Sequence, residues 1–196
     1  MRKRGGKLRS LLGALTAVLV VAAVLVGFAV VAVNALAPGS WAARAAPVCS
    51  AAAPIKVGTI TVPAGPIAGY CQAQLANAAH IMNAARASGI GTRTQTVGVM
   101  TAMGESGLVV LNHGDAAGPD SRGLFQQRDN GAWGSLADRM DPVISATNFF
   151  KKLVTVPGWR TMEPTAIAHS VQVNEDPNHY ASYWTDAQAV VSALSG

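Results

Sequence analysis

Gly104-Glu105-Ser106-Gly107-Leu108 closes a segment, beginning near residue 94, whose apolar residues recur at helical spacing. Glu105 is one of only three glutamates in the chain. A carboxyl group at the C-terminal end of a helix lies at the negative end of the dipole, and partial burial disfavours its charged form. Both effects raise the pKa, as a general acid near neutral pH requires. We expect Glu105 to be a catalytic acid; the alternative is a solvated glutamate at a helix end.

Helix signals also flank this segment on both sides. A helical pattern precedes it and is stopped by glycines, and Asp141-Pro142 is a cap followed by a proline at the first helical position. Prolines 164 and 177 introduce two later patterns. The predicted helices therefore span about 72–87, 94–104, 144–154, 164–171 and a final segment through Leu194. These patterns predict a mainly α fold.

A glycine-rich loop, residues 112–134, separates the second and third predicted helices. Long ordered loops in small helical domains usually carry function. The aspartates of this loop do not keep the spacing of a calcium-binding loop, and the chain has no His-Glu-x-x-His motif. We expect neither a metal nor a cofactor.

The turn Ser121-Arg122-Gly123-Leu124-Phe125-Gln126 follows Glu105 by sixteen positions, and residues 166–172 and Tyr180 come later. In this order the chain resembles the lysozyme-like superfamily, in its soluble lytic transglycosylase and goose-type lysozyme branch, over about residues 72–192. Residues 103–134 resemble a version found in membrane-anchored or secreted cell-wall enzymes of actinobacteria, some borne on conjugative elements. The resemblance implies a lysozyme-like helical domain with long ordered loops that cleaves peptidoglycan between N-acetylmuramic acid and N-acetylglucosamine.

Site residues follow from this resemblance position by position. Glu105 matches the catalytic acid, and Ser106 the residue that supports its helix end. The family's Ala-Tyr-Asn helix is replaced by Ala168-His169-Ser170-Val171-Gln172, so Gln172 or His169 must take over those contacts. Aromatic residues stack on sugars, and Trp133 after the turn is the one we expect to line the cleft. The further substrate-binding residues are expected to be Ser121, Gly123, Leu124, Gln126 and Tyr180.

The mechanism depends on whether a second carboxylate takes part. Hydrolases of this type use two acidic groups, and Asp115 and Asp120 in the loop are the candidates, although both also suit turns. A lytic transglycosylase needs only one glutamate, because the muramic acid 6-hydroxyl attacks its own anomeric carbon. We favour the transglycosylase. A muramidase-type hydrolase and a non-catalytic wall-binding or scaffold subunit are the alternatives.

The N-terminal residues predict a membrane anchor. Five basic residues lie in residues 1–10, and the remaining chain carries ten basic and ten acidic side chains, which gives no support to nucleic-acid binding. Residues 11–33 are uncharged and would form a helix of roughly 34 Å, enough to cross a membrane. We expect a span over 11–36 with a cytoplasmic N-terminus; a cleaved signal peptide is the alternative. The implied partner, from the resemblance, is a membrane-spanning transfer or secretion machine.

The proposed outer location bears on the two cysteines. Cys49 and Cys71 are the only ones, and in an oxidising compartment they predict a disulfide; the alternative is a Cys71 nucleophile with His169 as its base. Residues 37–69 hold five prolines and predict a stalk, within which the β-branched residues 55–62 indicate a short strand or hairpin. The compact, catalytic domain is predicted to cover residues 70–196.

Overall fold

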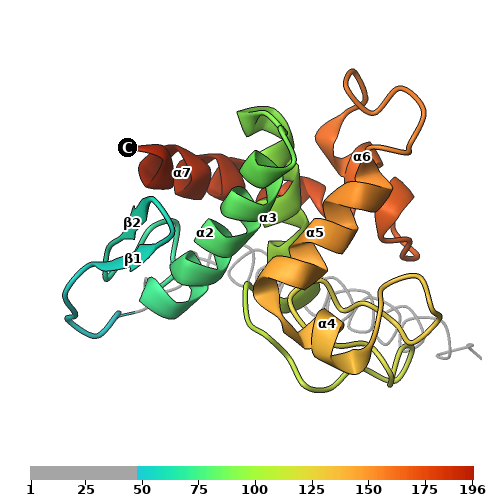
Figure 1. The fold of residues 1–196 in the computed structure, drawn as a ribbon, viewed down its shortest axis with the longest axis horizontal. Coiled ribbons are helices and arrows are strands. Elements are labelled where there is room, and N and C mark those ends of the chain that lie inside the picture. Colours follow the sequence, from blue (N-terminus) through green and yellow to red (C-terminus); the bar gives the residue numbers. More distant parts are fainter. Residues whose placement is uncertain (1–47) are drawn as a thin grey trace, which may run out of the picture. The chain divides into compact units, whose positions relative to one another are not determined.

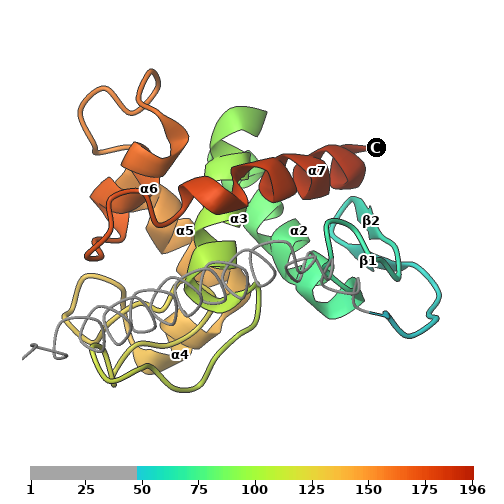
Figure 2. The ribbon, with the colours of Figure 1, turned by 180° about the vertical axis from the view of Figure 1, so that it is seen from behind.

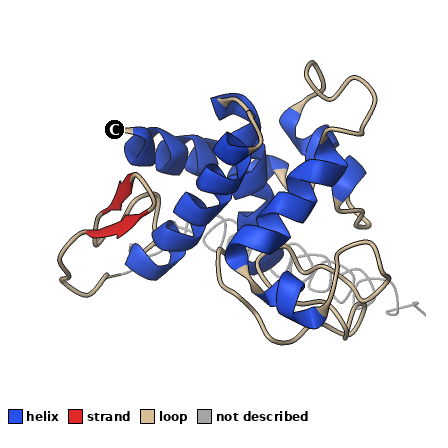
Figure 3. Cartoon of the chain, in the orientation of Figure 1, coloured by secondary structure: helices blue, strands red, loops and turns tan. Residues whose placement is uncertain are grey.

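The computed structural model describes residues 48–196, which contain six α-helices, one 3-10 helix and a two-stranded hairpin (Figures 1 and 3). The predicted mainly α fold is confirmed for this part of the chain. The elements are β1 (Ile55–Val57), β2 (Ile60–Val62), α2 (Gln72–Ala87), α3 (Thr92–Ser106), α4 (Leu136–Met140), α5 (Pro142–Leu153), α6 (Pro164–Val171), η1 (Ala181–Tyr183) and α7 (Trp184–Ser195).

Helix α3 runs through the centre of the domain, with α2, α5 and α7 packed around it (Figures 1 and 2). Every residue from Thr94 to Met103 is buried. Gly98 permits the close approach of α5, because a Cβ at this position would lie 2.5 Å from Cζ of Phe150. The helix that carries Glu105 in its last turn is therefore held in place on several sides.

The helix starts follow the expected capping chemistry. Asp141 accepts hydrogen bonds at 2.8 Å from the backbone N–H groups of both Val143 and Ile144, and Pro142 occupies the first turn of α5. Helix α4 was not predicted, since its five residues are too few to show an apolar period. A capping box between Ser135 and Asp138 begins it.

The hairpin belongs to the folded unit. Strands β1 and β2 are antiparallel, and Val57 pairs with Ile60 across the turn. Val57, Ile60 and Val62 are buried, and Asn83 of α2 donates to the Val57 carbonyl at 2.9 Å. The compact unit thus extends toward the N-terminus beyond the predicted boundary at residue 70, because the apolar residues of this segment pack on α2 instead of forming a stalk.

A disulfide joins Cys49 to Cys71, whose Cα atoms lie 5.4 Å apart. Cys71 is the residue at the start of α2, so the bond fastens the segment before the hairpin to this helix. Neither cysteine has a free thiol. The alternative of a Cys71 nucleophile with His169 as its base is therefore excluded.

The predicted tail, span and first part of the stalk, residues 1–47, lie outside the described residues. Among the helices of residues 48–196, none is long and apolar enough to cross a membrane.

Candidate active site

Glu105 lies in the last turn of α3, which ends sharply after it. Gly107 takes the left-handed conformation with φ +62°, and its N–H group bonds back to the Met103 carbonyl at 3.0 Å. This helix end requires a residue without a Cβ penalty, which glycine supplies. The backbone therefore turns away directly after Glu105 and Ser106.

Helix α2 holds this turn by two side-chain amides. Gln74 Nε2 donates to the Gly107 carbonyl and Asn77 Nδ2 to the Leu108 carbonyl, each at 2.8 Å. Both acceptors come just after α3, where helix carbonyls lack partners of their own. The position of Glu105 is thereby tied to α2 as well as to its own helix.

Tyr180 is the partner of Glu105. Its side chain is fully buried, and its hydroxyl donates a hydrogen bond to Glu105 Oε1. The ring reaches the helix end because residue 104 is glycine: a Cβ there would lie 2.7 Å from Cδ1 of Tyr180. His179 lies on the same side, with Nε2 3.2 Å from the Gly104 carbonyl oxygen.

These surroundings raise the pKa of Glu105 above the usual carboxyl range. Burial is the largest cause, because it disfavours the ionised form. The hydrogen bond from Tyr180 and the charge of His179 act in the opposite direction, and the charge of Asp115 adds to the rise. Glu105 is thus a carboxyl group that keeps its proton at higher pH than an exposed glutamate, which is the property a general acid needs.

The turn of residues 121–126 is fastened beside this helix end. Ser106 Oγ lies 2.8 Å from the Leu124 carbonyl oxygen, and Gln172 Nε2 donates to the Phe125 carbonyl. Gly123 has φ +77°, and a Cβ there would lie 1.9 Å from the Arg139 carbonyl oxygen. The structure therefore brings the predicted Glu-Ser helix end, turn and downstream tyrosine into one cluster.

Several residues predicted to bind substrate have structural roles in this cluster. Ser121 and Gly123 are buried, Leu124 is fully buried, and the Gln126 amide donates to the Gly123 carbonyl of its own turn. The Gln172 amide donates to the Phe125 carbonyl, as described above, and the Tyr180 hydroxyl donates to Glu105. The side chains of Gln126, Gln172 and Tyr180 thus make hydrogen bonds within the protein.

The prediction that Trp133 lines a cleft needs correction. Its side chain is only 4% exposed and belongs to the apolar core. Asn148 donates to its carbonyl at 3.1 Å, and Lys152 Nζ lies 4.6 Å from its ring centre. The ring is covered because the end of the loop folds back on α5, which the local sequence does not reveal.

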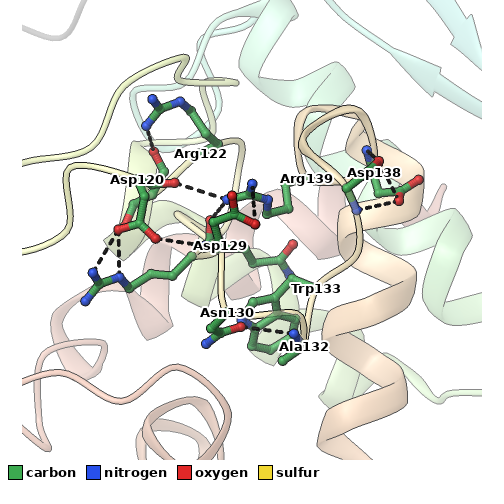
Figure 4. A network of polar contacts seen from close by, with 12 residues as sticks. Asp120, Arg122, Asp129, Asn130, Ala132, Trp133, Asp138 and Arg139 are labelled. Atoms are coloured by element: carbon green, nitrogen blue, oxygen red, sulfur yellow. Dashed lines mark hydrogen bonds and ion pairs between the residues drawn. The ribbon is translucent and has the colours of Figure 1, made fainter.

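Asp120 belongs to a polar network that orders the loop (Figure 4). Its carboxylate pairs with Arg128 at 2.8 Å and accepts from the Asp129 backbone N–H at 2.8 Å. The hydrogen bond from Arg128 is the main reason that the pKa of Asp120 falls to about 2. The buried Arg139 donates to the backbone carbonyls of Asp120 and Gln127 and pairs with Asp129. A carboxylate so engaged is a poor proton acceptor, which weighs against Asp120 as the second catalytic group.

Asp115 has a different position. Its side chain is exposed, and it caps a turn by accepting from the N–H groups of Ala117 and Gly118 at 3.0 and 2.8 Å. Asp115 is also the carboxylate whose charge raises the pKa of Glu105. Of the two candidate second carboxylates, Asp115 is the one with an electrostatic link to the glutamate.

Two polar residues beside the Glu105–Tyr180 pair, His179 and Asn174, had no signal in the sequence. His179 lies at the Gly104 carbonyl, as described above. The polar atoms of the Asn174 side chain are buried beside the Tyr180 hydroxyl. His169, which the sequence had offered together with Gln172, lies on α6, and its Nδ1 is buried without a hydrogen-bond partner in the described part. Neither His179 nor Asn174 occurs in a motif, and only the fold reveals their surroundings.

The described residues contain no group of three or more His, Cys, Asp or Glu side chains placed to hold a metal ion. The cluster instead offers a carboxyl group with a raised pKa, which can donate and recover one proton.

A scan of the chain against protein-family models finds no match, and a search of the curated proteins finds none either.

Proposed function

We propose that this chain is a lytic transglycosylase with a lysozyme-like domain, which cleaves the β-1,4 bond between N-acetylmuramic acid and N-acetylglucosamine in peptidoglycan. The observation that carries the proposal is the half-buried Glu105 at the end of α3, with a raised pKa and the Tyr180 hydroxyl as its partner. The helical fold and the contact of the Glu-Ser helix end with the turn of residues 121–126 support it.

The proposed reaction uses Glu105 twice. Protonated Glu105 donates its proton to the bridging oxygen as the bond from that oxygen to the muramic acid C1 breaks. The muramic acid 6-hydroxyl then forms a bond to C1, and the carboxylate of Glu105 takes the proton that this hydroxyl loses. The products are a 1,6-anhydro sugar end and a free 4-hydroxyl. The glutamate regains its proton, and no water is consumed.

A hydrolase is the second candidate, and the electrostatic effect of Asp115 on the pKa of Glu105 is the observation that favours it. Retaining glycosidases place two carboxyl groups about 5–5.5 Å apart, and inverting enzymes about 6.5–9.5 Å. Asp115 is exposed and acts electrostatically on Glu105. In this reaction a water molecule, in place of the muramic acid 6-hydroxyl, would supply the oxygen that ends up bonded to C1.

We place the domain outside the cytoplasmic membrane, held there by the predicted span of residues 11–36. The Cys49–Cys71 disulfide supports an oxidising compartment. Cutting of wall strands close to the membrane would make room for a membrane-spanning transfer or secretion machine, which is the partner we propose.

The full chain, purified in detergent, tests the proposal on isolated peptidoglycan, with mass spectrometry of the released muropeptides. We expect products with anhydro ends from the native protein and a loss of at least about a hundredfold in Glu105→Gln, since a general acid contributes roughly that much or more. Glu163→Gln is the matched control, because Glu163 is an exposed glutamate that precedes α6.

Products with reducing ends, one water heavier, would reject the transglycosylase in favour of the hydrolase. Peptidoglycan bound equally by the native protein and Glu105→Gln, with no release from either, would reject both enzymes and leave the wall-binding or scaffold subunit. Equal loss in Glu105→Gln and Glu163→Gln would remove the special role of Glu105.

A further inference from the structure

The hydroxyl group of Tyr180 lies between two hydrogen-bond acceptors. It donates to Glu105 Oε1, and its oxygen lies 3.1 Å from the backbone carbonyl oxygen of Gln172. A phenol has one O–H, so it can donate to only one of these acceptors at a time. The Tyr180 side chain is fully buried. A buried acceptor that has no hydrogen-bond donor lowers the stability of the protein.

We propose that Tyr180 is a positioning residue whose O–H bond turns from the Glu105 carboxylate to the Gln172 carbonyl when Glu105 takes up a proton. With Glu105 ionised, the O–H of Tyr180 donates to the carboxylate. With Glu105 protonated, the carboxyl O–H donates to the Tyr180 oxygen, and the Tyr180 O–H donates to the carbonyl. No proton passes between the two side chains, and only the phenolic O–H rotates.

The groups around Tyr180 are fixed in a way that suits this exchange. Gln172 closes α6 through its N–H bond to the Ala168 carbonyl at 2.8 Å, and its side chain is held by Phe125, so its carbonyl is a stationary acceptor. The Tyr180 ring packs against Gly104. Burial, followed by the charge of Glu105, raises the pKa of Tyr180, so the phenol keeps its proton in both arrangements.

The exchange gives both protonation states of Glu105 a hydrogen-bond partner. This consequence rests on the proposed function, in which Glu105 is first an acid and then a base within one cycle. Three titratable groups act on Glu105: Tyr180, His179 and Asp115. Of these, the hydroxyl of Tyr180 is the group that can serve as donor to the carboxylate and as acceptor from the carboxylic acid.

The first test is an NMR titration of the Glu105 carboxyl carbon in the full chain in detergent micelles, with the signal assigned from Glu105→Gln. We expect Tyr180→Phe to raise the pKa of Glu105 by about one to two pH units, since the ionised form loses a hydrogen bond to a charged group. Tyr183→Phe is the matched control, because Tyr183 packs beside the His179 ring while Tyr180 holds the glutamate. We expect no shift in this control.

The second readout is the backbone carbonyl carbon of Gln172, followed in the same titration. In the native protein its chemical shift should change with pH with the same midpoint as the Glu105 titration. In Tyr180→Phe its chemical shift should stay constant. A Gln172 signal that is constant through the native Glu105 titration overturns the exchange, as does an unchanged Glu105 pKa in a folded Tyr180→Phe. If that variant does not fold, the native Gln172 signal decides alone.

Neither readout needs a substrate. A protein that releases no muropeptides but shows both titrations would refute the proposed function and keep the exchange. A protein that cuts peptidoglycan while the Gln172 carbonyl signal stays constant would support the proposed function and refute the exchange.

Discussion

At the scale of single residues, Glu105 combines two properties that oppose each other in water. It is a carboxyl group, and its burial disfavours the charge that carboxyl groups normally carry. Tyr180 and His179 partly offset that penalty. The balance leaves a raised pKa, so the native state binds a proton at Glu105 more tightly than the unfolded state does.

This raised pKa predicts how stability changes with pH. The unfolded chain releases the Glu105 proton at about pH 4.3, and the native protein releases it at higher pH, so the free energy of unfolding falls across that interval. Glu105→Gln has no such proton. We therefore expect this variant to gain stability relative to the native protein as pH rises above about 4.3. Denaturant unfolding from pH 4 to 7 measures the difference.

Glu163→Gln is again the control, since Glu163 is exposed and should show no comparable trend. Parallel stability curves for the native protein and Glu105→Gln over this range would contradict the raised pKa.

The two loop aspartates can be separated by their amide variants. If the reaction is a transglycosylation, Asp115→Asn should keep most of the activity, whereas a hydrolase should lose about a hundredfold or more. Asp120→Asn should weaken the loop instead, because Asp120 pairs with Arg128. The contribution of Asp120 to stability is complete above about pH 4 and lost as the pH falls through its native pKa of about 2. Muropeptide release and denaturant unfolding distinguish the two effects.

At the scale of elements, the glycines of α3 set the distances at which its neighbours pack. We expect Gly104→Ala to push Tyr180 from Glu105, since the new Cβ would lie 2.7 Å from its ring. The strain should cost about 1–3 kcal/mol of stability, and activity per folded molecule should fall. Gly98→Ala is the control in the same helix, since its Cβ would meet Phe150 at 2.5 Å in the core.

Denaturant unfolding measures the loss of stability in each variant, and muropeptide release measures the loss of activity. Both lose stability, but Gly98→Ala keeps its activity per folded molecule. Full activity in a folded Gly104→Ala would show that the Tyr180 contact does not matter for the reaction.

The loop of residues 112–134 is ordered by an element outside it. The side chain of Arg139 of α4 lies among the loop residues Asp120 and Asp129 (Figure 4). It donates to the backbone carbonyls of Asp120 and Gln127. Its own side chain is 3% exposed. Sequence reasoning predicted an ordered loop from its glycines and aspartates, but the side chain that organises it comes from a helix too short to predict.

At the scale of the whole molecule, the disulfide and α2 connect the N-terminal hairpin to the end of α3, where Glu105 lies. Cys71 caps the start of α2, and the Gln74 side chain in the first turn of this helix donates to the carbonyl of Gly107. We expect replacement of both cysteines by serine to lower the free energy of unfolding by about 3 kcal/mol, because the crosslink restricts the unfolded chain. Serine is a good helix-capping residue, so α2 should still begin directly after residue 71.

Denaturant unfolding of the native and double-serine proteins, each under non-reducing conditions, measures this contribution. A reductant should destabilise the native protein to a similar extent and leave the variant unchanged. Equal stabilities of the two proteins would contradict the prediction.

Local sequence patterns predict the features that depend on neighbouring residues. Helix starts at proline and cap residues, the end of α3 and the place of Glu105 in its last turn all follow from local patterns. Which distant residues come into contact depends on the packing of the folded chain. Tyr180 reaches Glu105 across 75 positions of chain, and Trp133 enters the core against the expectation that it lines a cleft. The reason is physical: caps and turns act over a few residues, whereas burial and the pKa of Glu105 depend on packing between segments far apart in the chain.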